Sequence, residues 1–127
     1  MLDINLPELN REETKKNVLK ALKKYRLFLS SVDHRIIERV ENGDIDGISE
    51  KDIKRAEFIL DVRRGVNKLN LYDKQLIELA YLGREKHSWV KMCEKLNMTQ
   101  PDYYRKRNKA FYELAYKLGI EVEEFHS

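Results

Sequence analysis

Apolar residues recur every three or four positions through most of the chain, and charged residues fill the positions between them. That spacing places the apolar side chains on one face of an α-helix. Residues 11–29 show it with Val18, Leu22 and Tyr25 on one face and lysines on much of the rest. The pattern predicts a basic amphipathic helix there, followed by a shorter helix at 33–41.

The segment 42–47 interrupts this pattern with the sequence Asn-Gly-Asp-Ile-Asp-Gly, whose residue types favour turns. We expect a linker at this point. Four further helices are expected, at 49–68, 70–82, 88–96 and 99–118. Each begins with a side chain able to cap its first turn: Ser49, Asn70, Ser88 and Thr99. Three of them end at residues suited to the left-handed conformation: Gly83, Asn97 and Gly119.

The last two helices have apolar faces that should pack together. We expect five residues of the first to be buried: Trp89, Val90, Met92, Cys93 and Leu96. The last helix should face Trp89, Met92 and Leu96 with an apolar row: Tyr103, Ala110, Leu114 and Leu118. Its opposite side carries the outward row: Pro101, Tyr104, Arg105, Asn108 and Tyr112.

Strand-like alternation and internal repeats are absent from the sequence. The predicted fold class is therefore all-α, a helical bundle with an N-terminal amphipathic helix. The chain length suits one domain or a domain with an extension. We divide it into a helical arm at 1–41, which is a candidate association region, and a helical domain at 49–127.

Composition supports this fold class and narrows the setting. Charged residues make up 37% of the 127 residues, against five glycines and two prolines, which suits charge-rich surface helices better than strands joined by many turns. The single cysteine, Cys93, cannot form an intrachain disulfide. Neither a signal-peptide core nor an apolar run of membrane-spanning length is present. We therefore expect a cytoplasmic protein that does not associate with membranes.

No pattern typical of an enzyme is present. Cys93 lies on the apolar side of its expected helix, where a cysteine behaves as a small hydrophobic residue more often than as a nucleophile. The histidines His34, His87 and His126 lack the spacing of a metal site, and glycine-rich phosphate loops are missing. We expect no catalytic activity, no metal and no cofactor.

Positive charge is concentrated in the C-terminal third of the chain. Residues 84–109 carry eight basic and three acidic side chains, whereas the tail that follows is acidic. The overall net charge of +3 is too small to identify a partner. The basic segment fits a surface for phosphate groups, and a solvated helix face is the alternative interpretation of charge alone.

The helices expected at 70–82, 88–96 and 99–118 have the arrangement of a helix-turn-helix, because only Asn97 and Met98 separate the last two. In that arrangement the last helix lies in the major groove of duplex DNA. The candidate base-reading residues are Gln100, Tyr104, Arg105 and Asn108. The candidate phosphate contacts are Ser88, Lys106, Arg107, Lys109 and Tyr112.

The residues from Ser88 to Ala110 resemble the promoter-reading region four of bacterial sigma factors, without a gap. Sigma-like proteins usually have an apolar residue where this chain has Lys106. The run Tyr103-Tyr104-Arg105, with the basic residues after it and Ala110, is more similar to the ArpU-type family of phage late-gene transcriptional regulators. The segment 14–26 also resembles that family's opening helix. The resemblance implies DNA binding in gene control, without deciding between activation and repression.

Taken together, these features predict a sequence-specific, duplex DNA-binding transcriptional regulator of phage or prophage late genes, acting in the cytoplasm of a bacterial host cell. RNA polymerase is a further candidate partner, and both a homodimer and a monomer stay open. Two alternatives stay open as well. One is a protein-interaction module that docks on RNA polymerase or another partner, and the other is a small DNA-packaging subunit of a phage terminase.

Overall fold

The computed structural model describes residues 2, 4, 6–83, 85 and 87–124. Their elements, in chain order, are α1 (Arg11–Ser31), α2 (His34–Glu41), α3 (Glu50–Asn67), α4 (Leu71–Ile77), the π-helical segment η1 (Glu78–Leu82), α5 (Trp89–Leu96) and α6 (Gln100–Leu118). The described residues contain no strand, only one isolated β-bridge. The predicted all-α fold class is confirmed.

The helices begin and end largely where the sequence places their caps. The side chains of all four predicted N-caps accept a hydrogen bond from the backbone N–H three residues further on: Ser49, Asn70, Ser88 and Thr99. Asn97 and Gly119 take the left-handed conformation, with φ of 52° and 70°. Each capping bond satisfies one of the backbone N–H groups that a helix terminus leaves unpaired.

The predicted left-handed stop at Gly83 is wrong. Gly83 is extended, with φ −75° and ψ 172°, and the last five residues of the expected helix form the π-helical segment η1. The Arg26 side chain of α1 donates from Nη1 to the carbonyl oxygens of Tyr81 and Gly83, both at 2.9 Å. At a helix end, a glycine in the left-handed conformation usually lets the backbone pair the last carbonyl groups. Here the Arg26 side chain of α1 pairs with two carbonyl groups at the end of η1 instead.

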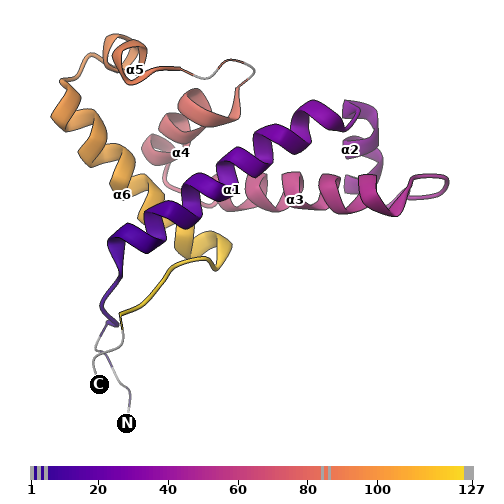
Figure 1. The fold of residues 1–127 in the computed structure, drawn as a ribbon, viewed down its shortest axis with the longest axis horizontal. Coiled ribbons are helices and arrows are strands. Elements are labelled where there is room, and N and C mark those ends of the chain that lie inside the picture. The colour runs from indigo at the N-terminus through magenta and orange to yellow at the C-terminus, as the bar shows by residue number, and fades with distance from the viewer. Residues whose placement is uncertain (1, 3, 5, 84, 86, 125–127) are drawn as a thin grey trace.

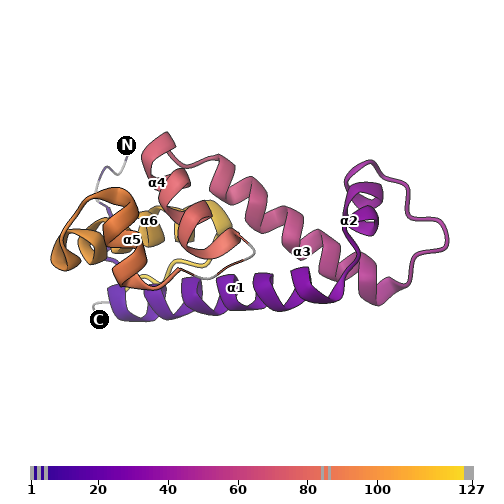
Figure 2. The same cartoon turned by 90° about the horizontal axis from the view of Figure 1, so that it is seen from above.

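Helix α1 lies along the length of the molecule and packs on both α3 and α6 (Figures 1 and 2). Figure 2 shows α4, α5 and α6 gathered at one end, with α2 and the turn after it at the other. Helix α6 crosses α1, α3 and α4, and α5 packs on α6. At the crossing with α3, a Cβ atom at Gly65 would lie 2.5 Å from Leu118 Cδ2, so glycine permits the close approach of α3 and α6.

The turn predicted at 42–47 is confirmed, with Gly43 and Gly47 at φ of 78° and 76°. It joins α2 to α3, and these two helices pack on each other. The buried residues before and after the turn belong to one hydrophobic cluster, which includes Tyr25 of α1 and Phe111 of α6. The division into an arm at 1–41 and a domain at 49–127 stays a prediction about which parts fold separately.

The two ends of the described chain meet beside the start of α1. Leu9 forms an antiparallel bridge with Glu123, and the Asn10 N–H donates to the Val122 carbonyl oxygen at 2.7 Å. The buried hydroxyl of Thr14 accepts a hydrogen bond from the Val122 N–H at 3.0 Å. These contacts fix the first turn of α1 against the segment that follows α6. Among the described residues, no helix is long and apolar enough to cross a membrane.

Candidate nucleic-acid interface

The turn between α5 and α6 sets the position of the candidate recognition helix. Asn97 adopts the left-handed conformation, and the Met98 N–H donates to the Cys93 carbonyl oxygen at 3.1 Å. Thr99 then caps α6, and Pro101 lies in its first turn. The chain therefore passes from α5 to α6 through Asn97, Met98 and the N-cap Thr99, and both the left-handed Asn97 and the Thr99 cap are as the sequence predicts. That this pair of helices acts as a helix-turn-helix stays a prediction.

The apolar side of α6 is buried largely as predicted. Tyr103, Ala110 and Leu114 are buried, and Leu118 is partly buried against the core. Phe111 and Ala115 are also fully buried, because α6 packs on α1, α3 and α4 as well as on α5. The prediction considered the preceding helix as the only packing partner of α6, so the buried face that it predicted was too narrow.

The predicted burial of Trp89 and Val90 is wrong. Trp89 is 42% exposed and Val90 is 47% exposed, whereas Met92 is completely buried. Cys93 and Leu96 are partly buried. Among the described elements, α5 has its main contacts with α6, and its first turn lies at the end away from the 97–99 turn. Within the described part of the chain, the apolar side chains of that first turn stay accessible.

Four candidate base-reading residues lie on the first two and a half turns of α6. Gln100 and Arg105 are exposed, and Tyr104 and Asn108 are half-buried. The Arg105 guanidinium pairs with the Asp102 carboxylate one turn earlier. Its side chain is still 73% exposed, and an exposed ion pair of this kind contributes only about 0.2 to 1 kcal/mol. Arg105 can therefore exchange this partner for another acceptor at small cost.

Arg107 is more enclosed than its prediction as a phosphate contact implies. Its guanidinium lies over the rings of Tyr104 and Phe111, with its central carbon 4.8 and 4.9 Å from their centroids. It also donates to Asn108 Oδ1, from Nη2 at 2.9 Å and from Nε at 3.3 Å. This fork holds the Asn108 amide in one orientation, with its NH₂ group directed away from Arg107.

Two of the predicted phosphate lysines contact the start of α4 instead of standing free. The Lys109 ammonium lies 3.2 Å from Asp73 Oδ2, and the Asp73 side chain is only 2% exposed. Asn70 Nδ2 donates to the same oxygen at 2.9 Å. The Lys106 ammonium lies 5.2 Å from the centroid of the Tyr72 ring. The role of both lysines as phosphate contacts stays a prediction, but each also ties α6 to α4.

Ser88 and Tyr112, the remaining candidates, differ in their surroundings. Ser88 Oγ accepts the N-capping hydrogen bond from the Lys91 N–H at 3.3 Å. The Tyr112 ring lies half-buried beside α1, with the guanidinium carbon of Arg11 6.0 Å from its centroid. Arg84 and Lys86, two basic residues of the segment 84–109, lie outside the described residues.

A shallow hollow brings the outward face of α6 together with the first residue of α1. It is lined by Arg11, Arg105, Asn108, Lys109, Tyr112 and Glu113. Four of these six are residues that the sequence predicts to contact DNA. Sequence reasoning missed Arg11, which lies 94 positions before Arg105, and only the packing of α1 on α6 places them side by side.

Burial also affects two tyrosines beneath this face. It raises the pKa of Tyr103 far above its ordinary value near 10, with the neighbouring Tyr81 hydroxyl adding to the rise. Burial raises the pKa of Tyr81 as well, and the nearby Arg107 guanidinium opposes that rise. Both rings therefore stay neutral and act as core side chains, as predicted for Tyr103.

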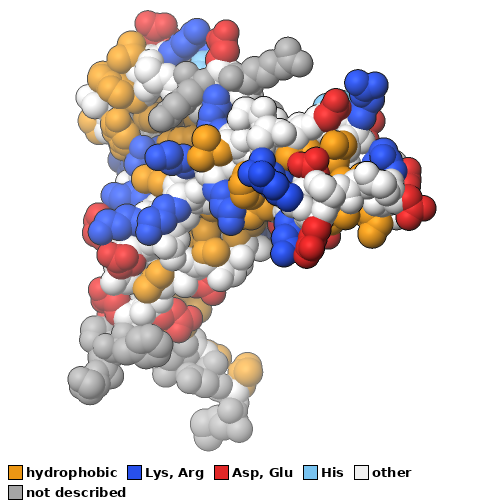
Figure 3. Space-filling model, turned by 45° about the vertical axis from the view of Figure 1, so that its right-hand side comes forward, with side chains coloured by type: hydrophobic (Ala, Val, Ile, Leu, Met, Phe, Trp, Pro, Cys, Tyr) orange, Lys and Arg blue, Asp and Glu red, His pale blue; other side chains and the backbone are white. Residues whose placement is uncertain are grey.

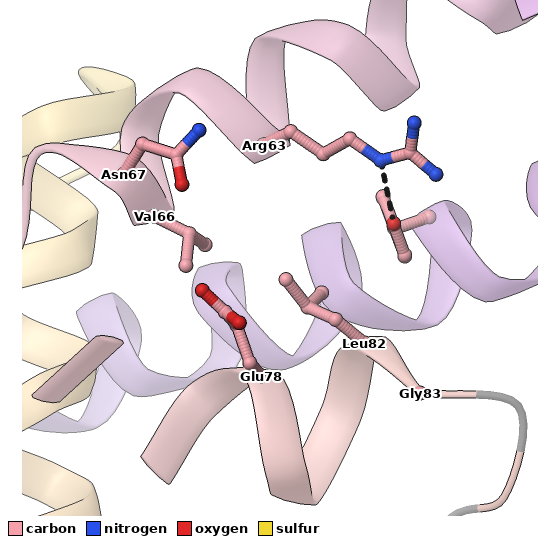
Figure 4. A pocket seen from close by; sticks show the side chains of 7 residues that line it. Arg63, Val66, Asn67, Glu78, Leu82 and Gly83 are labelled. Atoms are coloured by element: carbon pink, nitrogen blue, oxygen red, sulfur yellow. Dashed lines mark hydrogen bonds between the residues drawn. The ribbon is translucent and has the colours of Figure 1, made fainter. Parts of the chain in front are cut away.

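A separate pocket of about 370 Å³ lies between α1, α3 and η1. Figure 4 shows Arg63, Asn67 and Glu78 around it, with Arg63 Nε donating to the Tyr25 hydroxyl at 3.1 Å. The Glu78 carboxylate also lies 3.7 Å from the Lys74 ammonium. None of the residues predicted to bind DNA lines this pocket.

Basic side chains extend beyond α6. Figure 3 shows Lys and Arg side chains gathered across the middle of one face of the molecule. Helix α1 contributes exposed lysines at Lys16, Lys20, Lys23 and Lys24. Acidic side chains are more frequent near the paired chain ends, with Glu8, Glu12 and Glu124 lining one hollow. The charge is therefore distributed unevenly between parts of the surface.

The chain is similar over nearly its whole length to a phage-related protein. The relative is the "Uncharacterized phage-related protein Lin1259/Lin1739" of Listeria innocua, which is 23% identical over 137 aligned positions. The alignment covers 94% of this chain and 96% of the relative. No protein-family model and no solved structure matches the chain.

Proposed function

We propose that this protein is a sequence-specific, duplex DNA-binding transcriptional regulator of phage or prophage genes, with the first half of α6 in the major groove. The observation that carries the proposal is the set of polar side chains on α6, the exposed Gln100 and Arg105 and the half-buried Asn108, directly after a tight turn from α5. Arginine reads guanine through paired hydrogen bonds in the major groove, and the Asn108 NH₂ group, which the Arg107 fork directs outward, can donate to a base acceptor such as adenine N7.

The dimensions of α6 suit this role. An α-helix with its side chains is about 10–12 Å across, which fits the roughly 12 Å width of the major groove, and residues 100–108 present about 12 Å of helix length to it. The apolar side of the same turns is held against the protein by Tyr103 and Ala110. The outward row can therefore enter the groove without loss of core packing.

The surroundings of α6 supply the electrostatic attraction that DNA binding needs. Lys106 and Lys109 flank the row, and the lysines of α1 add positive charge on a neighbouring surface. Contacts to phosphates fix position and orientation, whereas base contacts supply sequence preference. The similarity to a phage-related protein supports a phage or prophage setting, and the resemblance to ArpU-type regulators supports late-gene control.

Selection of binding sites from random duplexes at fixed salt tests this proposal. We expect a consensus sequence, and Arg105→Ala and Asn108→Ala should each reduce the preference for the selected site over a scrambled one. A lost paired base contact costs about 1–3 kcal/mol, or roughly 5- to 150-fold. Lys117→Ala, on an exposed position at the far end of α6, is the matched control and should leave the preference unchanged. Failure to enrich any sequence would contradict the proposal.

A second candidate function is a protein-interaction module that docks on RNA polymerase. The exposed Trp89 and Val90 on α5 favour it, because aromatic and large apolar side chains are enriched in protein interfaces. Duplex binding and binding to purified RNA polymerase, measured side by side at low salt, separate the two. Polymerase binding that Trp89→Ala abolishes, without any duplex binding, would favour this second function.

A further inference from the structure

We propose that Arg11, the first residue of α1, contacts a DNA backbone phosphate in the hollow beside Tyr112. The inference rests on the proposed function and adds to it a contact from the opposite end of the chain. The hollow lies where the middle of α6 passes the start of α1, and Arg105 and Asn108 line it together with Arg11. The expected ligand is one phosphate of the duplex that α6 reads.

The position of Arg11 is fixed by contacts on both sides. The preceding residue, Asn10, caps α1 by accepting from the Glu13 N–H at 3.1 Å, and its own N–H pairs with Val122. One turn later, the buried Thr14 hydroxyl pairs with the same residue, Val122. The Arg11 backbone therefore belongs to the packed structure, while its side chain is exposed. Because the backbone is already ordered, only the Arg11 side chain loses freedom when its guanidinium contacts a phosphate.

Arg11 is also the basic residue of the hollow that is least engaged by the protein. Lys109 pairs with the buried Asp73, and Arg105 pairs with Asp102. Within the described part of the chain, Arg11 makes no ion pair, and its guanidinium carbon lies 6.0 Å from the Tyr112 ring centroid. A phosphate can therefore bind Arg11 without first breaking an ion pair.

Acidic side chains limit where the DNA strand can pass. Glu8, Glu12 and Glu124 line an adjoining hollow that shares Arg11 and Tyr112 with the first one, and Glu113 lines the first hollow itself. These carboxylates repel phosphate, so the strand should lie on the Arg105 side of Arg11. The sugar-phosphate backbone forms the edges of the major groove, and recognition units make their phosphate contacts at those edges. Arg11 lies beside the middle of α6, where we expect α6 to leave the groove and pass one of these edges.

The salt dependence of binding tests the contact. Wild-type protein, Arg11→Ala and Arg11→Lys are titrated with a selected duplex and a scrambled duplex at several salt concentrations. Arg11→Ala should weaken binding to both duplexes by the same factor, and the slope of log affinity against log salt should fall by about one. Arg11→Lys should keep the wild-type slope. Lys51→Ala, which removes an exposed charge from the first turn of α3 at the other end of the molecule, is the control and should also keep the slope.

Three results would overturn the contact. One is an unchanged slope in Arg11→Ala, and another is an equal fall in Lys51→Ala, which would reduce the effect to total charge. The third is a loss of preference for the selected duplex in Arg11→Ala, which would make Arg11 a base reader. Undetectable binding of either duplex by the wild-type protein would instead overturn the proposed function itself. Melting curves of every variant should match wild type, because both substituted side chains are exposed.

Discussion

Substitution of Lys109 by alanine should have a larger effect on the stability of the fold than on DNA recognition. Lys109 comes from α6, and its partner Asp73 lies in the first turn of α4 with only 2% of its side chain exposed. The Lys109 side chain itself is 62% exposed, so water already screens one end of the pair. Without Lys109, the buried carboxylate keeps Asn70 Nδ2 as a donor but loses its cation.

The expected cost lies between those of two limiting cases. A hydrogen bond to a charged group contributes about 1.5–3 kcal/mol, whereas an exposed ion pair contributes about 0.2–1 kcal/mol. One partner is buried and the other exposed, so Lys109→Ala should cost about 1–2 kcal/mol. In a chain of this length that corresponds to a melting temperature lower by about 4–8 °C.

Urea unfolding of wild type, Lys109→Ala, Asp73→Asn and the double variant measures this pair directly. The double variant should be less destabilised than the sum of the two single variants, because the second change removes a group that has already lost its partner. Lys117→Ala, which changes an exposed lysine in the last turn of α6, is the control and should unfold like wild type. The reasoning would be refuted if Lys109→Ala kept wild-type stability and lost only about one unit of salt slope, since Lys109 would then be a phosphate contact alone.

Three further predictions follow from the same structure. Met92→Ala should lower the free energy of unfolding in urea by about 2–5 kcal/mol, because Met92 is completely buried. Trp89→Ala should lower it by less than about 1 kcal/mol, because Trp89 is exposed. A larger loss for Trp89→Ala than for Met92→Ala would contradict the placement of α5. Arg107→Lys should lower sequence preference as Asn108→Ala does, because lysine cannot hold the Asn108 amide with two hydrogen bonds. A variant with both changes should lose no more preference than either change alone. Additive losses would show that Arg107 and Asn108 act independently. Burial raises the folded-state pKa of Tyr103, so the free energy of unfolding linked to its protonation is fully present below pH 10 and is lost as the pH rises above 10. Thermal melts from pH 8 to 11 should show this decline. An equal decline in Tyr103→Phe would contradict the assignment to Tyr103.

Local sequence signals predicted most of the fold. The four N-caps, the left-handed Asn97 and Gly119 and the turn at Gly43 and Gly47 all depend on residues within three or four positions of one another. Such signals act through the backbone of their own segment, so they are readable without knowledge of the tertiary packing. The buried row on α6 was predictable for the same reason, since it follows from helical periodicity.

The errors arose where a distant segment decides the outcome. The end of the helix at Gly83 depends on Arg26, which lies 57 residues earlier. Trp89 was predicted to pack against α6, but the packing of α5 on α6 buries Met92 and leaves Trp89 exposed. In the candidate site, the pairing of Lys109 with Asp73 and the presence of Arg11 both come from contacts between helices. Residue type and spacing within α6 identified its outward row. They could not identify which of its basic side chains already pair with other residues of the protein.

Groove-specific base analogues test the central claim, that α6 reads the major groove, most directly. In the selected duplex, each guanine is replaced in turn by 7-deazaguanine, which lacks the N7 acceptor of the major groove, or by inosine, which lacks the N2 amino group of the minor groove. The account predicts that 7-deazaguanine at one position weakens wild-type binding, that it has no further effect on Arg105→Ala, and that inosine at that position is tolerated. Weakening by inosine, with 7-deazaguanine tolerated at every position, would place the protein in the minor groove and contradict the account.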